Sequence, residues 1–377
     1  MSVIKTEKQS IVWITADYFV DCDFDPAVFE GLLKVFDIHW IVLLPASNAR
    51  FSEKDFAGLK RLSGLQIEVR VWRCRARSPR MLLFYESLYK RIRKLKPDLV
   101  YFNEVPTNPY ILPLYRRIAR RKSIVTAHDG KVNASFKLAW ISNLVFELAF
   151  SAVSFVNMFS ASQARIFLEN FPRPKVFLIP LGLKNFGPVL KPRRSDAIVF
   201  FFFGAIHPTK NVELLIDAAC RLYDEGVRGF KVAICGRSDD WERYRQRIRY
   251  PEIFECDIRT FPSSELPGVF GENHYMVLPY SRMSQSGALK AAFNYRTPVI
   301  VSDLEAFKDE VADGVNGFVF KSEDVADLAR VMRERILKHA EEFSLIVKRL
   351  DHFVEEHYSK NRMISMYADM FHEVLAT

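Results

Sequence analysis

The chain has 377 residues, 49% hydrophobic and 26% charged, so it is globular and long enough for two domains with full cores. Its five cysteines are scattered without a Cys-x-x-Cys pair, which argues against zinc and for a reducing compartment. Residues 1–194 hold 31 Lys and Arg against 16 Asp and Glu, a net of +15; the remainder holds 23 against 29, a net of −6. We therefore expect only one domain to face a polyanion.

Short apolar runs bounded by turns alternate with helical patterns along the whole chain. We interpret as strands residues 11–15, 39–44, 67–72, 99–102, 123–127, 152–159 and 175–180, then 197–203, 230–235, 275–279, 298–301 and 317–320. Helical periodicity occupies residues 26–36, 80–95, 211–224 and 323–339. The alternation predicts an α/β fold with two doubly wound, Rossmann-like domains, because the strands are too many for one sheet.

The segment 182–194 is rich in Gly, Pro and charge, so we interpret it as the interdomain linker. It separates an N-terminal domain at 1–187 from a C-terminal domain at 195–357. Residues 1–10 are polar and precede only a short apolar run, so we expect no signal peptide. The apolar stretch 136–161 is interrupted by Asn143, Glu147 and Asn157, which favours a buried helix and a strand over a membrane span.

The most informative stretch lies at 278–303, where a strand leads through a small polar loop into a helix. The loop is Ser284, Gln285, Ser286 and Gly287. A loop of this kind presents free backbone N–H groups and the positive end of the helix dipole, which suits a phosphate group. Taken by itself, however, the segment favours an ordinary strand-to-helix turn.

A second helix start with the same character follows the strand at 197–203. That strand ends at Gly204, and Lys210 stands at the mouth of the helix at 211–224. A solvated surface lysine is the alternative for this segment alone. Two helix starts suited to an anion within one domain favour a nucleotide diphosphate site.

The joint spacing of these segments resembles glycosyltransferase family 4, which comprises retaining, nucleotide-sugar-dependent enzymes of the GT-B fold, with two Rossmann-like domains that face a cleft. The resemblance covers the second domain, whereas the first domain matches only by layout. It also implies that residues 358–377 return to the first domain as a helix. The residues that carry it are Phe203-Gly204, Lys210, Leu278-Pro279-Tyr280, Gln285-Ser286-Gly287, Pro298-Val299-Ile300, Ser302-Asp303 and Asp313 to Phe318.

The resemblance implies that Lys210 binds the donor phosphates and stabilises the leaving group. It places Ser286 and Gly287 in the loop whose amides hold the distal phosphate and sugar, and we count Gly204, Ser284 and Gln285 with them as donor-binding.

Two departures from the family pattern are visible. Ala205 follows Gly204 in a region where relatives often carry an arginine, and Met283 and Ala291 stand where relatives carry paired glutamates. The chain is therefore similar to the Gln-Ser-Gly subset that lacks the pair. Arg282 is our candidate for the missing positive charge.

In the first domain, His128 and Asp129 follow the strand at 123–127 and resemble the family's strand-end His-Asp pair, in which the histidine lies beside the transferred sugar. We predict His128 as catalytic and Asp129 as acceptor-binding; a loop histidine bonded to its neighbour is the alternative. Asn103 and Glu104 end the strand at 99–102 and are further candidates for acceptor hydroxyls. The motif Asp21-Cys22-Asp23 mimics the metal-binding Asp-x-Asp of another glycosyltransferase fold, but we expect neither a metal nor a cofactor.

The basic charge is densest at 70–96, where ten Lys and Arg residues are interleaved with aromatic and aliphatic side chains. This mixture is typical of docking on an anionic membrane surface. Nucleic acid is the competing polyanion, but no nucleic-acid-binding motif is present, so we expect no nucleic-acid partner. A solvated basic face without a partner stays open as the alternative.

These observations predict a cytoplasmic enzyme, peripheral on the inner face of the cell membrane. It would transfer a sugar from a nucleotide-sugar donor, a UDP- or GDP-sugar, to a lipid-linked, oligosaccharide, polysaccharide or lipopolysaccharide acceptor. Two alternatives stay open. One is a nucleotide-sugar 2-epimerase-like enzyme, for which only His207 and His274 are available in the second domain. The other is a catalytically inactive GT-B interaction protein, suggested by the missing glutamates.

Overall fold

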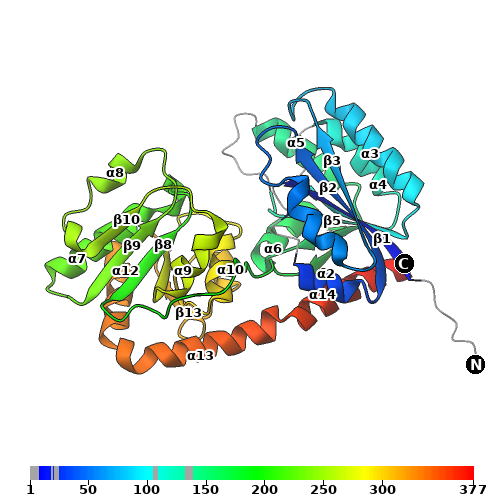
Figure 1. Cartoon of the computed structure of the whole chain (residues 1–377). Helices are drawn as coiled ribbons and strands as arrows, with labels where there is room; N and C mark the ends of the chain where they lie inside the picture. The colour runs from blue at the N-terminus through cyan, green and yellow to red at the C-terminus, as the bar shows by residue number, and fades with distance from the viewer. Residues whose placement is uncertain (1–7, 18–19, 21–24, 105–108, 132–138) are drawn as a thin grey trace, which may run out of the picture. The chain divides into compact units, whose positions relative to one another are not determined.

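The computed structural model describes residues 8–17, 20, 25–104, 109–131 and 139–377, which fold into two compact units (Figure 1). Unit 1 comprises the described residues up to Gly182 together with Lys360–Thr377. Unit 2 comprises Leu183–Ser359. The chain therefore crosses between the units twice, after Gly182 and after Ser359.

The described part of unit 1 contains a sheet of seven parallel strands in the order β3-β2-β1-β4-β5-β6-β7. The strands are β1 (Gln9–Ala16), β2 (Phe36–Pro45), β3 (Leu65–Trp72), β4 (Leu99–Asn103), β5 (Ser123–Ala127), β6 (Phe155–Met158) and β7 (Lys175–Leu178). The strand order reverses between β1 and β4. In open sheets of this kind, ligands bind at the carboxyl ends of the strands beside such a reversal.

Helices cover both faces of this sheet, which is why its strands are near-continuous apolar runs. One face packs against α3 (Met81–Leu95), η3 (Pro109–Ile111), α4 (Leu112–Ile118), α5 (Ala139–Phe150) and α6 (Ala161–Asn170). The other face packs against α2 (Pro26–Leu32), η2 (Glu53–Arg61) and α14 (Lys360–Ala376), and Figure 1 shows α14 beside α2. The last helix of the chain thus completes the core of unit 1.

Unit 2, all of whose residues are described, has six parallel strands in the order β10-β9-β8-β11-β12-β13. The strands are β8 (Ile198–Phe203), β9 (Phe230–Cys235), β10 (Phe254–Asp257), β11 (Tyr275–Leu278), β12 (Val299–Ser302) and β13 (Gly317–Phe320). The helices are η4 (Pro208–Lys210), α7 (Val212–Asp224), α8 (Trp241–Arg245), η5 (Pro251–Ile253), η6 (Ser263–Glu265), α9 (Leu266–Gly271), α10 (Gly287–Asn294), α11 (Glu305–Lys308), α12 (Val325–Leu337) and α13 (His339–Tyr358).

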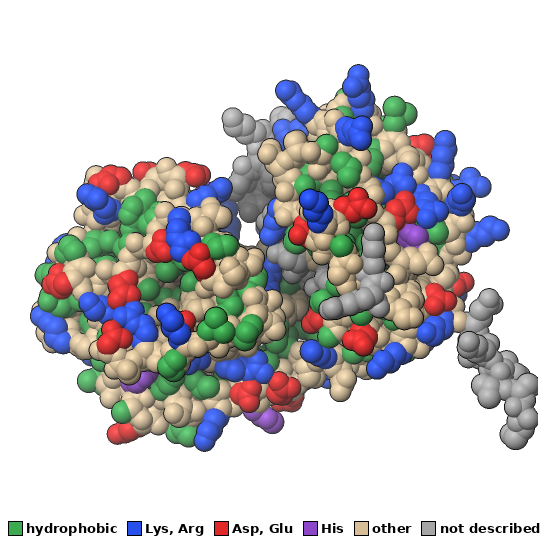
Figure 2. All heavy atoms as spheres, viewed as in Figure 1, with side chains coloured by type: hydrophobic (Ala, Val, Ile, Leu, Met, Phe, Trp, Pro, Cys, Tyr) green, Lys and Arg blue, Asp and Glu red, His purple; other side chains and the backbone are tan. Residues whose placement is uncertain are grey.

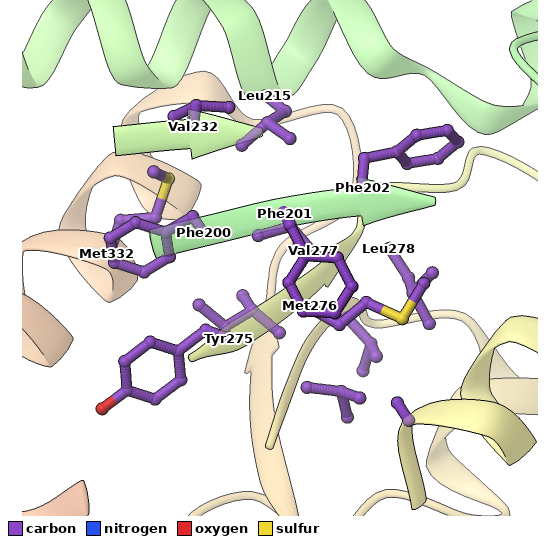
Figure 3. Packing of buried hydrophobic residues seen from close by; sticks show 14 of the residues in the cluster. Phe200, Phe201, Phe202, Leu215, Val232, Tyr275, Met276, Val277, Leu278 and Met332 are labelled. Carbon is purple, nitrogen blue, oxygen red and sulfur yellow. The ribbon is translucent and has the colours of Figure 1, made fainter. Parts of the chain in front are cut away.

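The central strand β8 explains the stability of unit 2. Phe200, Phe201 and Phe202 are fully buried, and they lie among side chains of β9, β11, α7 and α12 (Figure 3). Burying one such side chain stabilises the fold by about 1.5–3 kcal/mol, so a run of three phenylalanines fixes this strand at the centre of the sheet. The carboxyl ends of β8 and β11 are thereby held side by side.

The predicted α/β class with two doubly wound, Rossmann-like sheets is confirmed, and every predicted strand overlaps a strand of the structure. The sequence reasoning missed β10, a short edge strand with the alternating, mostly exposed sequence Phe254–Asp257. It also missed α13, which fills the gap between the two predicted C-terminal helices. The apolar stretch 136–161 contains a helix and a strand as expected, namely α5 and β6, and residues 136–138 lie outside the described residues.

The segment that we interpreted as the linker packs on unit 2. The backbone N–H of Phe186 donates to the Tyr295 hydroxyl over 2.8 Å, and the Arg193 guanidinium donates to the backbone carbonyls of Asn273 and Arg296. The change of unit therefore falls at Gly182, at the start of this segment. In the described part of the chain, we find no helix with the length and apolarity that a membrane span requires.

Candidate functional site

The first candidate site lies at the carboxyl ends of β8 and β11 in unit 2. Gly204 follows β8 with φ +146°, a conformation that favours glycine. A Cβ on Gly236, which follows β9, would come within 1.9 Å of the Gly204 carbonyl oxygen. Two neighbouring strands thus end in glycines that let their turns approach closely.

The loops after β8 and β11 are joined to each other beside Lys210. The Ser281 N–H donates to the Thr209 carbonyl over 3.1 Å. The Lys210 ammonium lies 3.6 Å from the centre of the Tyr280 ring, a cation–π contact. Tyr280 is buried and its hydroxyl is hydrogen-bonded to Ser286, so Tyr280 connects Lys210 to the polar loop before α10. The two predicted halves of the donor site are therefore neighbours.

The polar loop ends in a helix cap at Ser286. The Ser286 backbone is extended (φ −135°, ψ 108°), and its Oγ accepts the N–H of Leu289 over 3.2 Å. The cap satisfies one of the first-turn N–H groups of α10. The others remain at the helix end, where the positive end of the dipole attracts an anion.

A second lysine, which the sequence reasoning missed, lies at this helix end. A Cβ built on Gly287 would lie 3.0 Å from Cε and 3.2 Å from Nζ of Lys184, so the ammonium sits against the first residue of α10. Arg282, our candidate for the missing positive charge, is exposed. Lys184 belongs to the segment interpreted as linker, and only its packing on unit 2 reveals its position.

Burial controls the charge of this edge. It lowers the pKa of Lys210 to about 8, which leaves the ammonium mostly protonated at pH 7. The two positions where relatives carry glutamates contribute no carboxylate: Met283 packs on the core and Ala291 is 1% exposed. The edge thus combines two ammonium groups with a helix N-terminus, and its chemistry suits a phosphate or diphosphate.

The second candidate site lies at the carboxyl ends of β4 and β5 in unit 1. Asn103, the last residue of β4, is fully buried, and its Oδ1 lies 2.8 Å from Nε2 of His128. Because an amide oxygen only accepts, Nε2 carries the ring proton in this arrangement. The predicted residues Asn103 and His128 are therefore in direct contact.

The environment of His128 keeps its ring neutral. The ring packs against Phe159 with 4.8 Å between centres, and burial lowers its pKa to about 3. The half-buried Asp129 follows it. The next residue, Gly130, is locked onto α6: its N–H donates to Gln163 over 3.0 Å, and a Cβ there would come within 2.5 Å of the Gln163 carbonyl oxygen. His128 is held in place as a neutral hydrogen-bonding group.

Glu104 brings a carboxyl group with a raised pKa to the same strand end. Its Oε1 accepts from the Tyr85 hydroxyl over 2.8 Å, and its carbonyl accepts from Tyr115 over 2.5 Å. Burial raises the pKa of Glu104 to about 7. Oε2 of Glu104 and Nδ2 of Asn103 are buried and have no partner among the described residues. Unsatisfied buried polar atoms are costly, so these two suit hydroxyl groups of a ligand.

Within the residues that the structure covers, no cluster of three or more His, Cys, Asp or Glu side chains is placed to hold a metal ion. The Asp21-Cys22-Asp23 motif lies outside the described residues.

Comparison with known proteins connects the first site to a function. Residues 197–337 match the family model described as "Glycosyl transferases group 1", which places both Lys210 and the Ser284–Gly287 loop inside the matched region. No curated protein matches the sequence. The matched region lies wholly within unit 2.

Solved structures resemble the whole chain at low sequence identity. Sucrose-phosphate synthase from Thermosynechococcus elongatus is 14% identical, with a TM-score of 0.74 and coverage of 98% of this chain and 100% of that one. Anabaena HepE in complex with UDP is also 14% identical, with a TM-score of 0.68 and coverage of 97% and 100%. The lipopolysaccharide outer core galactosyltransferase WaaB is 14% identical, with a TM-score of 0.66 and coverage of 97% and 99%. The chain shares the GT-B fold of these proteins.

Proposed function

We propose that the protein is a retaining glycosyltransferase that moves a sugar from a UDP- or GDP-sugar to a lipid-linked, polysaccharide or lipopolysaccharide acceptor. The observation that carries the proposal is the meeting of Lys210, Lys184 and the start of α10 at one strand edge, inside or beside the matched domain. HepE, a structural neighbour, binds UDP, and WaaB is a lipopolysaccharide galactosyltransferase.

In this proposal the donor diphosphate lies at the N-terminus of α10. Lys210 and Lys184 neutralise its charge, and the amides of Ser286 and Gly287 hold the distal phosphate. Gly204, Ser284 and Gln285 complete the donor loop. The bond between the sugar's anomeric carbon and the phosphate oxygen breaks, and the acceptor oxygen bonds to the same face of that carbon. The leaving diphosphate takes up the acceptor proton, so catalysis is mostly electrostatic stabilisation of charge that develops on the phosphate.

The acceptor groups come from unit 1. Asn103, Glu104 and Asp129 hold acceptor hydroxyls, and the neutral His128 lies beside the transferred sugar. A neutral imidazole fits this role, because a positive charge there would oppose the cationic character of an oxocarbenium-like transition state.

We further propose that the enzyme docks on the inner face of the cell membrane through unit 1. Eight of the ten basic residues in 70–96 are exposed, whereas Arg70 and Arg91 are bound to Glu68. Apolar side chains are also exposed on this unit: Leu82 and Leu83 on α3, and Trp140 and Leu144 on α5. Figure 2 shows Lys and Arg standing out from unit 1, while on unit 2 basic and acidic side chains lie next to each other. An acceptor that is anchored in the membrane would require the enzyme to bind at the membrane surface, and this basic surface would provide that binding.

The two histidines on which the epimerase alternative depends, His274 and His207, have other contacts in the structure. Nδ1 of His274 accepts the Val199 N–H over 3.1 Å at the amino ends of the strands, away from the candidate site. His207 is an exposed cap that accepts from the Thr209 N–H. Nucleotide binding distinguishes the proposed enzyme from the alternative of a catalytically inactive scaffold.

The test is a thermal-shift screen against UDP, GDP, ADP and CMP and their sugars. A nucleotide present at about 100 times its Kd stabilises a protein by about 2.7 kcal/mol, which raises the melting temperature by several degrees. We expect one nucleoside diphosphate to raise the melting temperature of the wild type and of Arg282→Ala by this amount. The same nucleotide should raise the melting temperature of Lys210→Ala much less. No stabilisation by any nucleotide would favour an inactive scaffold.

A further inference from the structure

Helix α10 follows the candidate donor loop. It also contacts residues next to both places where the chain crosses between the units, which are Gly182 and Ser359. The first crossing segment begins at Leu183, directly after Gly182. Its Lys184 lies against Gly287 at the N-terminus of α10. At the other end of α10, the hydroxyl of Tyr295 accepts from the Phe186 N–H over 2.8 Å and donates to the Gly187 carbonyl over 3.0 Å. The first crossing is therefore fastened to both ends of this helix.

The second crossing is fastened to the middle of α10 through a buried lysine. The Lys290 side chain is 1% exposed, and Nζ contacts the Glu310 carboxylate and lies 2.8 Å from the Tyr358 hydroxyl. Tyr358 is the last residue of α13, and its hydroxyl donates to Glu310 over 2.8 Å. The chain leaves unit 2 one residue later, at Ser359.

A lysine buried in an apolar core is costly, and burial lowers the pKa of Lys290 well below its usual value. Replacing such a pair with apolar groups of similar volume is often neutral or stabilising, so stability alone does not explain its presence. The position of the pair does suggest a role. It lies within one turn of Gly287 and binds the residue next to the crossing.

We propose that α10 transmits occupancy of the donor site to the two crossings, and that Lys290 is the positioning residue that fastens the second crossing to it. The inference rests on the proposed function, because it requires an anion to bind at the start of α10. A bound diphosphate draws on Lys184, which is part of the first crossing. A helix of eight residues, about 12 Å long, is stiff enough to pass that constraint to Lys290 and Tyr358.

The test compares two double variants, each of which removes the ion pair of a buried basic residue in unit 2. Lys290→Met with Glu310→Gln removes the pair at the crossing without leaving a buried charge. Arg335→Met with Glu342→Gln is the control, because Arg335 is also buried, at 6% exposed against 1% for Lys290, and pairs α12 with α13 far along the chain from Tyr358. Tyr358→Phe is a milder third variant that deletes only the hydroxyl.

Each protein is titrated with UDP, GDP, ADP and CDP by calorimetry, and its radius of gyration is measured by X-ray scattering with and without the bound nucleotide. We expect the nucleotide to change the radius of the wild type and of the control. In Lys290→Met with Glu310→Gln the nucleotide still binds, but the change falls to less than about half. The change in radius of gyration of Tyr358→Phe should lie between that of the wild type and that of the double variant.

If nucleotide changes the radius of gyration of Lys290→Met with Glu310→Gln as much as that of the wild type, the coupling is overturned. It is also overturned if the wild type binds nucleotide without any change in its radius of gyration. Absence of nucleotide binding to the wild type would instead overturn the proposed function, and the coupling with it. Equal losses in the Lys290 variant and the control would reduce Lys290 to a residue that only supports the fold.

Discussion

The carboxyl edges of the two sheets meet the same physical condition, burial, with opposite results for charge. At the edge of unit 2, burial lowers the pKa of Lys210 only to about 8, so the ammonium keeps its charge at pH 7. At the edge of unit 1, burial lowers the pKa of His128 to about 3 and raises that of Glu104 to about 7. One edge is therefore cationic and suits an anion, while the other holds neutral or half-neutral polar groups and suits hydroxyls. This difference is why we propose that unit 2 binds the donor and unit 1 the acceptor.

The largest effect should come from removing the charge at the cationic edge. We expect Lys210→Ala to lose about 2.7–4 kcal/mol of transition-state stabilisation, roughly a 100-fold or greater fall in kcat. The measurement is release of nucleotide diphosphate from the donor that the screen identifies. Lys210→Arg keeps the charge and should retain more activity. Near-normal turnover by Lys210→Ala would break the assignment of unit 2 as the donor side.

At the neutral edge, Glu104 should make stability depend on pH. Its pKa rises from 4.5 to about 7 on folding, so its contribution is fully present below pH 4.5 and is lost as pH rises through about 7. The loss is at most about 3.4 kcal/mol. Thermal melts from pH 5 to pH 8 should show a smaller decline for Glu104→Gln than for the wild type. Parallel declines would show that Glu104 ionises normally.

A smaller effect should separate the two candidates for the second positive charge of the donor site. Hydrogen bonds to charged groups contribute about 1.5–3 kcal/mol, so we expect Lys184→Ala to weaken binding of a nucleoside diphosphate by about tenfold or more. Arg282→Ala, at an exposed arginine in the same region, should bind nearly as the wild type does. Calorimetric titration of both variants decides the point, and the reverse ranking would assign the second positive charge to Arg282 instead of Lys184.

The smallest effect concerns the surfaces rather than the edges. Arg93 is exposed on α3 of unit 1, whereas Arg221 is exposed on α7 of unit 2 and paired with Glu225. A basic residue near an anionic membrane contributes about 1 kcal/mol, so Arg93→Ser should bind vesicles of anionic lipid about fivefold more weakly at low salt. Arg221→Ser should bind them as the wild type does. If the wild type does not bind these vesicles, the membrane proposal is wrong and the basic face is solvated without a partner.

The sequence predicted best where local pattern and position in the fold agree. The strand ends at Gly204, Leu278 and Asn103 follow from apolar runs closed by turns, so the contact of Asn103 with His128 needed only the parallel order of the strands. These features are local, and the parallel sheet then brings them to a common edge.

What the sequence did not predict depends on packing between distant segments. Lys184 was hidden in a segment that reads as linker until Tyr295 and α10 hold it. Lys290 reads as a surface residue of a short helix, although it is 1% exposed against Tyr358. The raised pKa of Glu104 comes from burial beside Tyr85 and Tyr115, and no nearby charge in the sequence signals it. The edge strand β10 lacks the apolar run that identifies buried strands.

The most direct test of the central claim is calorimetric binding of UDP and GDP to the wild type, Lys210→Ala and His128→Ala. If unit 2 is the donor side, one of the two nucleotides binds the wild type and His128→Ala with similar affinity and binds Lys210→Ala at least about tenfold more weakly. Equal binding to the wild type and Lys210→Ala, or loss of binding in His128→Ala alone, would contradict the account.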